Sequence, residues 1–285
     1  MTSNPKKVWT ILDIINWGKD YLQKHGISNA KLELEWFLSN LLSCSRIDLY
    51  VRFEEPLHAS ELNEIRTFIK RRITHEPFQY ILGKAPFYGR DFIVTPDVLI
   101  PRPETETIIE IAKNINKNGH FLEIGTGSGC IAITLLIENI FNSGYAIDIS
   151  HSALTIAKQN KKKLRIENLK FEEQNFLNQQ ITLKFDCIIS NPPYITPEEI
   201  ESLEDEVKKF EPQIALTDNA DGLSFYKKIA QEGFKLLNPN GFMILETGGN
   251  NQINIVESIF INSGYIVKIH KDQNNDNRFL EIQLK

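Results

Sequence analysis

The chain has 285 residues, enough for one large domain and a small one, and its 41% hydrophobic and 24% charged residues are ordinary for a globular protein. A formal net charge of −5 argues against a protein that wraps a long stretch of nucleic acid, although a local basic patch would survive that average. Three scattered cysteines exclude a disulfide framework, the histidines lack metal-ligand spacing, and no apolar run approaches the roughly 18 residues of a membrane span. We expect a cytoplasmic monomer with no metal site, no membrane contact and no stable nucleic-acid binding.

Apolar residues recur near the helical period from residue 8 to about residue 75, as in residues 11–22, 32–42 and 62–69. We therefore predict a small helical bundle and assign residues 1–75 to a helical domain. The basic run 70–72 has two interpretations, a solvated helix end favoured by the helix dipole or a contact with a ribosomal or RNA-associated partner.

Aromatic and β-branched runs, split by Gly83 and Gly89, follow between residues 77 and 99. Their pattern predicts a β-hairpin, and we assign residues 76–100 to a linker between two domains. The prolines at positions 101 and 103 then keep the chain extended until about Thr105, where a helix is expected to begin.

Residues 101–285 form the predicted second domain, in which apolar strands alternate with helical patterns. The helices are expected at residues 131–141, 152–164, 223–237 and 252–261. The strands are expected at residues 120–124, 145–149, 169–171, 185–190, 242–246, 265–270 and 279–284. Because the last two strands lie too close for a crossover helix, they should pair antiparallel. The predicted fold class is α/β, a doubly wound, mostly parallel seven-stranded Rossmann-like sheet with a small N-terminal helical bundle.

The sequence Asn191-Pro192-Pro193-Tyr194 ends the apolar run 185–190, which has the composition of a buried parallel strand. Ligands in such sheets bind beyond the carboxyl ends of the strands. Because proline has no N–H, the Asn191 side chain and the carbonyls of Asn191 and Pro192 are available as acceptors, and Tyr194 adds an aromatic face. This set suits a planar NH2 group. Taken alone, Asn-Pro-Pro is more simply a proline-rich turn.

A glycine-rich loop, Gly125-Thr126-Gly127-Ser128-Gly129, joins the first strand of this domain to its first helix. Alternate glycines let a ligand approach the backbone, and the spacing differs from the Gly-x-Gly-x-x-Gly of dinucleotide sites. Asp148 ends the next strand, where an acidic side chain can accept hydrogen bonds from both ribose hydroxyls. Glu123 either adds negative charge near a cationic ligand or is an ordinary hydrogen-bonded carboxylate.

The glycine loop, the ribose carboxylate and Asn-Pro-Pro-Tyr, in this order, are the constellation of an S-adenosylmethionine-dependent methyltransferase. The chain resembles one family of that class, the release factor N5-glutamine methyltransferases (HemK/PrmC family). The segment Pro-Arg-Pro-Glu-Thr-Glu at residues 101–106 is the most specific of the matching motifs. The other matches lie at residues 79–83, 87–89, 99–100, 125–129, 191–194, 211–212, 215–216 and 221–223, and at Glu246 and Gly248.

The resemblance implies S-adenosylmethionine as cofactor and, as substrate, the glutamine of the Gly-Gly-Gln loop of peptide chain release factors. We also expect the helical domain to recognise the substrate, because it has a separate core and a hairpin links it to the second domain. Substrate binding is expected at Asn191, Pro192, Pro193 and Tyr194, and catalysis at Asn191, Pro192 and Tyr194. The cofactor residues are expected to be Glu123, Gly125, Thr126, Gly127, Ser128, Gly129, Asp148, Phe176 and Asn191.

Two positions depart from the family pattern. Glu123 stands where aspartate is common, and Asn175-Phe176 stands where an acidic residue and a larger aromatic are common. Phe176 is therefore equally consistent with a contact to adenine and with a place in the core.

Other functions remain as alternatives. Ribosomal-protein glutamine methyltransferases look different at residues 101–106. An adenine-N6 or guanine-N2 methyltransferase could use the same tetrapeptide on an exocyclic amine, but such an enzyme usually needs a basic recognition cleft. The glycine spacing disfavours a nicotinamide-dependent dehydrogenase, and a non-catalytic binding module would leave Asn-Pro-Pro-Tyr unexplained.

Overall fold

The computed structural model describes residues 8–115, 118–249 and 252–285, and the chain divides into two compact units, Met1–Leu82 and Gly83–Lys285. The first unit is helical. Its helices are α1 (Ile11–Lys24), α2 (Ala30–Leu41), α3 (Arg46–Val51), α4 (Ala59–Arg72) and α5 (Phe78–Leu82).

Local signals define the helices of this unit and a shared apolar core holds them together. Thr10 caps α1 through its side chain, which accepts from the Asp13 N–H, while the Asp13 carboxylate accepts from the Thr10 N–H. The core includes the fully buried Leu34 and Phe68. Of the basic run 70–72, Arg72 is 2% exposed and its Nε donates to Glu33 Oε2 at 2.6 Å.

The predicted hairpin is shorter than expected. Residues Phe78–Leu82 form α5, and only β1 (Lys84–Phe87) and β2 (Arg90–Ile93) pair as antiparallel strands. The strand propensity of residues 78–82 is overridden by tertiary packing, since Phe78 and Ile81 pack against the core of the helical unit. The hairpin belongs to the second unit, whose core buries Phe87 and Phe92.

The second unit is built on a seven-stranded sheet in the order β5-β4-β3-β6-β7-β9-β8. Neighbouring strands from β5 to β7 are parallel, and β9 is antiparallel to both β7 and β8. The predicted doubly wound sheet with one reversed strand is therefore confirmed. The strands are β3 (His120–Ile124), β4 (Ser143–Asp148), β5 (Leu169–Glu173), β6 (Phe185–Ser190), β7 (Leu237–Glu246), β8 (Tyr265–Lys271) and β9 (Asn277–Leu284).

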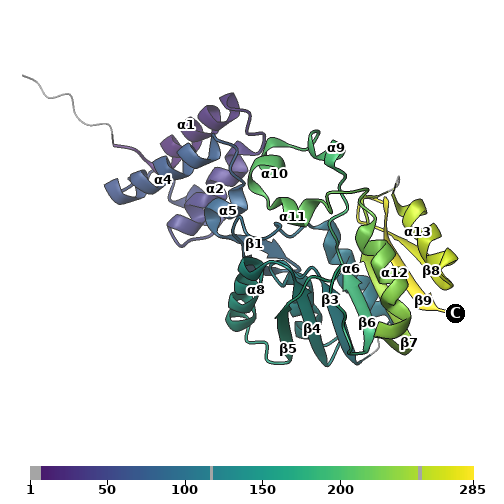
Figure 1. Cartoon of the computed structure of the whole chain (residues 1–285). Coiled ribbons are helices and arrows are strands. Elements are labelled where there is room, and N and C mark those ends of the chain that lie inside the picture. The colour runs from purple at the N-terminus through teal and green to yellow at the C-terminus, as the bar shows by residue number, and fades with distance from the viewer. Residues whose placement is uncertain (1–7, 116–117, 250–251) are drawn as a thin grey trace, which may run out of the picture. The chain divides into compact units, whose positions relative to one another are not determined.

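Helices cover both faces of this sheet (Figure 1). One core cluster packs α6 (Thr107–Ile115) and α7 (Cys130–Ile137) on one face, and the other packs α12 (Ser224–Leu236) and α13 (Ile253–Asn262) on the opposite face. A 3-10 turn, η1 (Glu104–Glu106), precedes α6. Three short helices lie between β6 and α12, namely α9 (Pro197–Ile200), α10 (Asp205–Phe210) and α11 (Gln213–Leu216).

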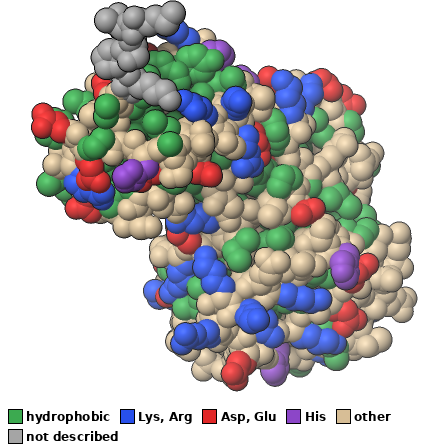
Figure 2. Space-filling model, turned by 90° about the vertical axis from the view of Figure 1, so that its left-hand side faces the viewer, with side chains coloured by type: hydrophobic (Ala, Val, Ile, Leu, Met, Phe, Trp, Pro, Cys, Tyr) green, Lys and Arg blue, Asp and Glu red, His purple; other side chains and the backbone are tan. Residues whose placement is uncertain are grey.

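Lysines gather on α8 (His151–Lys163), whose last turn contains Lys161, Lys162 and Lys163. Figure 2 shows basic side chains on the face of the second unit on which α8 lies. Cations at a helix C-terminus interact favourably with the helix dipole. Within the described ranges, no helix is long and apolar enough to cross a membrane.

Candidate active site

The glycine loop lies at the carboxyl end of β3 and forms one wall of a pocket. Gly125 and Gly127 have φ of +76° and +53°, and a Cβ built on either would meet nothing within 4 Å. Gly129 is different, because its Cβ would lie 3.2–3.3 Å from side chains of the packed interior. Two glycines therefore leave room for a ligand, and the third permits the close packing of the loop.

Asp148 connects this loop to the start of α8. Its Oδ2 accepts from the Gly127 N–H at 2.8 Å and its Oδ1 accepts from the Ser150 N–H at 2.9 Å. Burial raises the pKa of Asp148, and these backbone donors partly offset the effect. A carboxylate has about four acceptor sites, and the backbone donors to Asp148 leave acceptor capacity for a ligand in the pocket that it lines.

Glu123, near the end of β3 before the loop, does not line this pocket or the second pocket beside it. Its Oε2 accepts from the Thr126 hydroxyl, and its Oε1 is buried without a hydrogen-bond partner among the described residues. Burial, together with the charge of Asp148, raises the pKa of Glu123 to about 8. Thr126 and Ser128 are buried as well, and neither lines either pocket.

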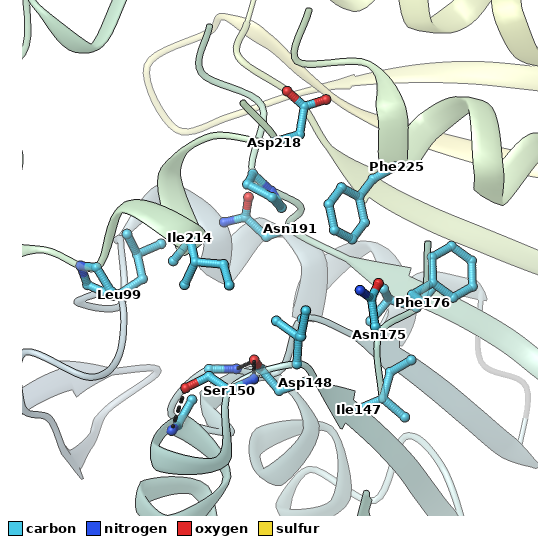
Figure 3. Close-up of a pocket in the computed structure, with 18 of the residues that line it drawn as sticks. Leu99, Ile147, Asp148, Ser150, Asn175, Phe176, Asn191, Ile214, Asp218 and Phe225 are labelled. Carbon is cyan, nitrogen blue, oxygen red and sulfur yellow. Dashed lines mark hydrogen bonds between the residues drawn. The ribbon is translucent and has the colours of Figure 1, made fainter. Parts of the chain in front are cut away.

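The Asn-Pro-Pro-Tyr segment separates two pockets. Asn191 lines both of them, Pro193 lines the pocket that contains the glycine loop, and Pro192 and Tyr194 line the second pocket. In Figure 3, Asn191 lies between Ile214 on one side and Phe225 on the other. We call these the glycine-loop pocket and the second pocket.

Contacts to its backbone carbonyl fix the position of Tyr194. The Gln252 Nε2 donates to the carbonyl of Tyr194 at 3.1 Å and to that of Gly222 at 3.2 Å. Gly222 has φ of +70°, and a Cβ there would lie 2.3 Å from the Tyr194 carbonyl oxygen. Burial raises the pKa of the Tyr194 phenol to about 12, so the ring stays neutral.

Phe176 lies between the glycine-loop pocket and the core. It borders the glycine-loop pocket but is only 4% exposed, and it belongs to the core on the α12 face of the sheet. Its ring is nearly parallel to that of Phe225, with centroids 6.5 Å apart.

Sequence reasoning assigned no contact to residues 195–223, which follow the Asn-Pro-Pro-Tyr segment and precede α12, yet these residues help to wall both pockets. Ala215 and the upstream Leu99 line both of them. Glu211, 6% exposed, fastens the segment, because Arg102 Nη2 donates to its Oε1 at 2.6 Å and the Ile100 N–H donates to its Oε2 at 3.3 Å. The length of a connection without predicted elements is a signal that could have indicated a functional loop.

Comparisons with known proteins agree with this geometry. Residues 13–83 match the PrmC N-terminal domain and residues 115–283 match a methyltransferase domain. A release factor glutamine methyltransferase from Geobacter sulfurreducens is 40% identical over 93% of this chain and 93% of its own length. This chain belongs to the release factor glutamine methyltransferase family.

Two further comparisons add to this assignment. A bifunctional methyltransferase from Rickettsia bellii is 36% identical over 97% of this chain, which spans 55% of that protein. A methyltransferase structure from Pyrococcus furiosus covers 79% of this chain and 98% of its own, with 21% identity and a TM-score of 0.52, and it supports the fold alone.

The methyl donor of this family member is S-adenosylmethionine, and the glycine-loop pocket fits it. Gly125 and Gly127 leave the space that side chains would fill, and Asp148 offers unused acceptor sites for ribose hydroxyls. Apolar side chains such as Ile147 and Phe225 supply walls for a flat base.

Proposed function

We propose that this protein transfers a methyl group from S-adenosylmethionine to the side-chain amide nitrogen (N5) of the glutamine in the Gly-Gly-Gln loop of peptide chain release factors. The observation that carries the proposal is that Asn191 lines both pockets. A cofactor in the glycine-loop pocket and a glutamine in the second pocket would meet at this side chain.

The residues of the second pocket suit an amide substrate. The Asn191 side-chain oxygen and the Pro192 carbonyl would each accept one N–H of the glutamine NH2. These two bonds would orient the nitrogen and favour its pyramidal form as positive charge develops. Tyr194 would pack on the amide, where a neutral ring face also favours the developing cation.

Positioning is the main contribution of the protein. An amide nitrogen is a weak nucleophile, and S-adenosylmethionine, when bound, supplies a methyl carbon that the adjacent positive sulfur makes electrophilic. Holding reactants in line can contribute about 7–11 kcal/mol. Among the described residues that line the second pocket, none carries a carboxylate or an imidazole. The proton is therefore expected to leave to solvent after transfer.

The remaining assignments belong to the same proposal. Glu123, Thr126, Ser128 and Gly129 would support the cofactor site from beneath the loop, and Phe176 would contact the adenine through its pocket-facing edge. The helical unit would recognise the release factor. We also propose a cytoplasmic monomer that does not hold nucleic acid stably. The charge of the pockets supports the last of these points: the described residues that line them include no lysine, and their one arginine, Arg102, pairs with Glu211.

A methylation assay tests the substrate. The purified protein is incubated with methyl-labelled S-adenosylmethionine and, separately, unmethylated release factor, the same factor with the Gly-Gly-Gln glutamine changed to asparagine, ribosomal protein, DNA and RNA. We expect label only on the unaltered release factor, located by mass spectrometry on that glutamine. Label on another substrate, or equal label on the altered factor, would contradict the proposal.

Variants of Asn191 test the site itself. Asn191→Ala should slow methyl transfer by about 10- to 1000-fold, the scale for a lost charge-stabilising partner. Asn191→Asp is nearly isosteric and still accepts hydrogen bonds, so it should keep or tighten cofactor binding while changing turnover. Wild-type rates in both variants would place the chemistry elsewhere.

A further inference from the structure

Two hydrogen bonds in series lead from Asn191 away from the pockets and into the core. Asn191 Nδ2 donates to Thr105 Oγ1 at 3.3 Å, and the Thr105 hydroxyl donates to Glu246 Oε2 at 2.8 Å. Thr105 is 3% exposed and Glu246 is 2% exposed. Neither of them is among the described residues that line either pocket. Thr105 therefore contacts Asn191 directly, and Glu246 acts on Asn191 only through Thr105.

The fold brings these three residues together from distant parts of the chain. Ser190, the last residue of β6, pairs with Leu245 of the parallel strand β7, so the next residues lie side by side: Asn191 directly after β6, and Glu246 as the last residue of β7. Thr105 reaches them from η1, within the specific segment 101–106. The Tyr226 hydroxyl donates to the Glu246 backbone carbonyl at 2.7 Å, which fixes the end of β7.

The direction of the two hydrogen bonds determines how the Asn191 amide is oriented. When Glu246 is ionised its carboxylate only accepts, so the single hydroxyl proton of Thr105 must then point to Glu246. The Thr105 oxygen can then only accept from Asn191, which must present its NH2 group. A flipped amide would set its oxygen against the lone pairs of the Thr105 oxygen. The Asn191 carbonyl oxygen is therefore the end left to face a ligand.

We propose that Thr105 and Glu246 are positioning residues that hold the Asn191 amide in the one orientation able to accept a hydrogen bond from the substrate amide. This inference rests on the proposed function. It also gives the segment 101–106 a physical task at the site, which the sequence alone does not show. Without the pair, Asn191 would present its NH2 to the substrate part of the time, donor facing donor.

Two substitutions at Thr105 separate the hydrogen bond from the packing. Thr105→Val keeps the shape of the side chain and removes the hydroxyl, whereas Thr105→Ser keeps the hydroxyl and removes a methyl group. Full-length proteins are assayed for methyl transfer to release factor at saturating S-adenosylmethionine, and calorimetry measures cofactor affinity. We expect kcat to fall about 10- to 100-fold in Thr105→Val and about threefold or less in Thr105→Ser, with cofactor affinity within about twofold of wild type in both.

The outcomes divide clearly. Wild-type kcat in Thr105→Val, or an equal loss in both variants, would overturn the positioning role while leaving the proposed function in place. Absence of glutamine methylation by the wild-type protein would instead overturn the proposed function.

A variant of Glu246 carries the test if Thr105→Val does not bind cofactor. Glu246→Gln replaces a group that only accepts by one that can also donate, so the direction of the Thr105 hydrogen bond is no longer imposed. A fall in kcat of about 3- to 10-fold with unchanged cofactor affinity is expected, and wild-type kcat would overturn the inference.

Discussion

At the scale of single residues, the Asp148 carboxylate has to serve the glycine loop and the ligand at the same time. One of its oxygens accepts from the Gly127 N–H and the other from the Ser150 N–H. These bonds hold the carboxylate at the rim of the glycine-loop pocket and leave acceptor capacity on it. The ribose hydroxyls of S-adenosylmethionine can use that capacity.

Removing this carboxylate should weaken cofactor binding. Asp148→Ala should reduce the affinity for S-adenosylmethionine by about 1.5–3 kcal/mol, the scale of hydrogen bonds to a charged group. Glu173→Ala is the matched control, because Glu173 pairs in register with Asp148 on β5 but its side chain is 56% exposed and lines neither pocket. Calorimetry that finds equal affinities in the two folded variants would remove Asp148 from the site.

Glu246 introduces a pH dependence. Burial raises the pKa of its carboxyl to about 7, and the bond from Thr105 partly offsets this effect. The charged or titratable groups that face it are Arg278, Glu104, Arg102, Tyr194 and Tyr226. Below this pKa the protonated acid can donate to Thr105, and the orientation of the Asn191 amide is no longer imposed.

Activity and stability should therefore respond to acid in opposite directions. Because the folded-state pKa values of Glu246 (about 7) and Glu123 (about 8) lie above the ordinary value, their contribution to stability is present at low pH and is lost as the pH rises through those values. Between about pH 8 and pH 5.5 we expect the rate to fall while these two groups contribute more to the free energy of unfolding.

The pH dependence of kcat and a thermal melt at each pH check this expectation. Glu246→Gln cannot ionise, so the acid-side fall with a midpoint near 7 should disappear in that variant. An unchanged acid-side fall in Glu246→Gln would assign the titration to another group.

Sequence reasoning reached only part of this site. Asp148 and Asn191 follow apolar strands and could be predicted, because parallel strands bring their carboxyl ends to one edge of a sheet. The contact between Thr105 and Glu246 could not be predicted, since 141 positions separate them and only the folded chain places η1 behind β7. The sequence also leaves the role of Phe176 open, because an apolar aromatic side chain suits both a pocket and a core, and in the fold it borders both.

At the scale of elements, the glycine loop combines two structural tasks that its repeated composition does not distinguish. Gly127 faces open space, whereas Gly129, with φ of +79°, lies 3.2 Å from Ile133 once a Cβ is added. Both positions have positive φ, so an alanine strains the backbone by a similar amount at either. Any difference between the two alanine variants therefore comes from what the added methyl group meets.

Gly127→Ala and Gly129→Ala should affect different properties of the protein. We expect Gly127→Ala to reduce cofactor affinity more, because its methyl group enters the pocket. Gly129→Ala should lower the melting temperature more, because overpacking costs about 1–3 kcal/mol. Calorimetry and thermal unfolding of both variants make the comparison, and the reverse ranking would mean that the ligand does not lie against Gly127.

The elements that sequence reasoning missed are those with weak local signals. The buried strands and long amphipathic helices have clear periodicity. Residues 78–82 have strand-like composition but form α5, because Phe78 and Ile81 bury against the helical core. Helices α9 to α11 have four to six residues each, too short for a period to be recognised.

At the scale of the whole molecule, each unit has a core of its own, and the helical unit presents apolar side chains to solvent. Trp36 is 50% exposed, and Ile47 and Val51 are each 75% exposed. Hydrophobic side chains are visible on the surface of this unit in Figure 2. The second unit also has exposed apolar side chains, such as Phe234 and Ile266, so exposure alone does not mark the recognition surface. Those of the helical unit are the ones that the proposed recognition of a release factor would use.

The last prediction separates recognition from chemistry. The fragment 83–285 contains all described residues of both pockets and keeps Phe87 and Phe92 in its core. It should bind S-adenosylmethionine within about threefold of the full chain, and methylate intact release factor at least about 10-fold more slowly, because interface contacts are lost. A short glutamine peptide, too small to contact the helical unit, should react equally with both proteins. A fragment from residue 101 should be much less stable, since losing buried phenylalanines costs about 3–5 kcal/mol each. Full activity of the fragment 83–285 on intact release factor would show that the helical unit has no part in recognition.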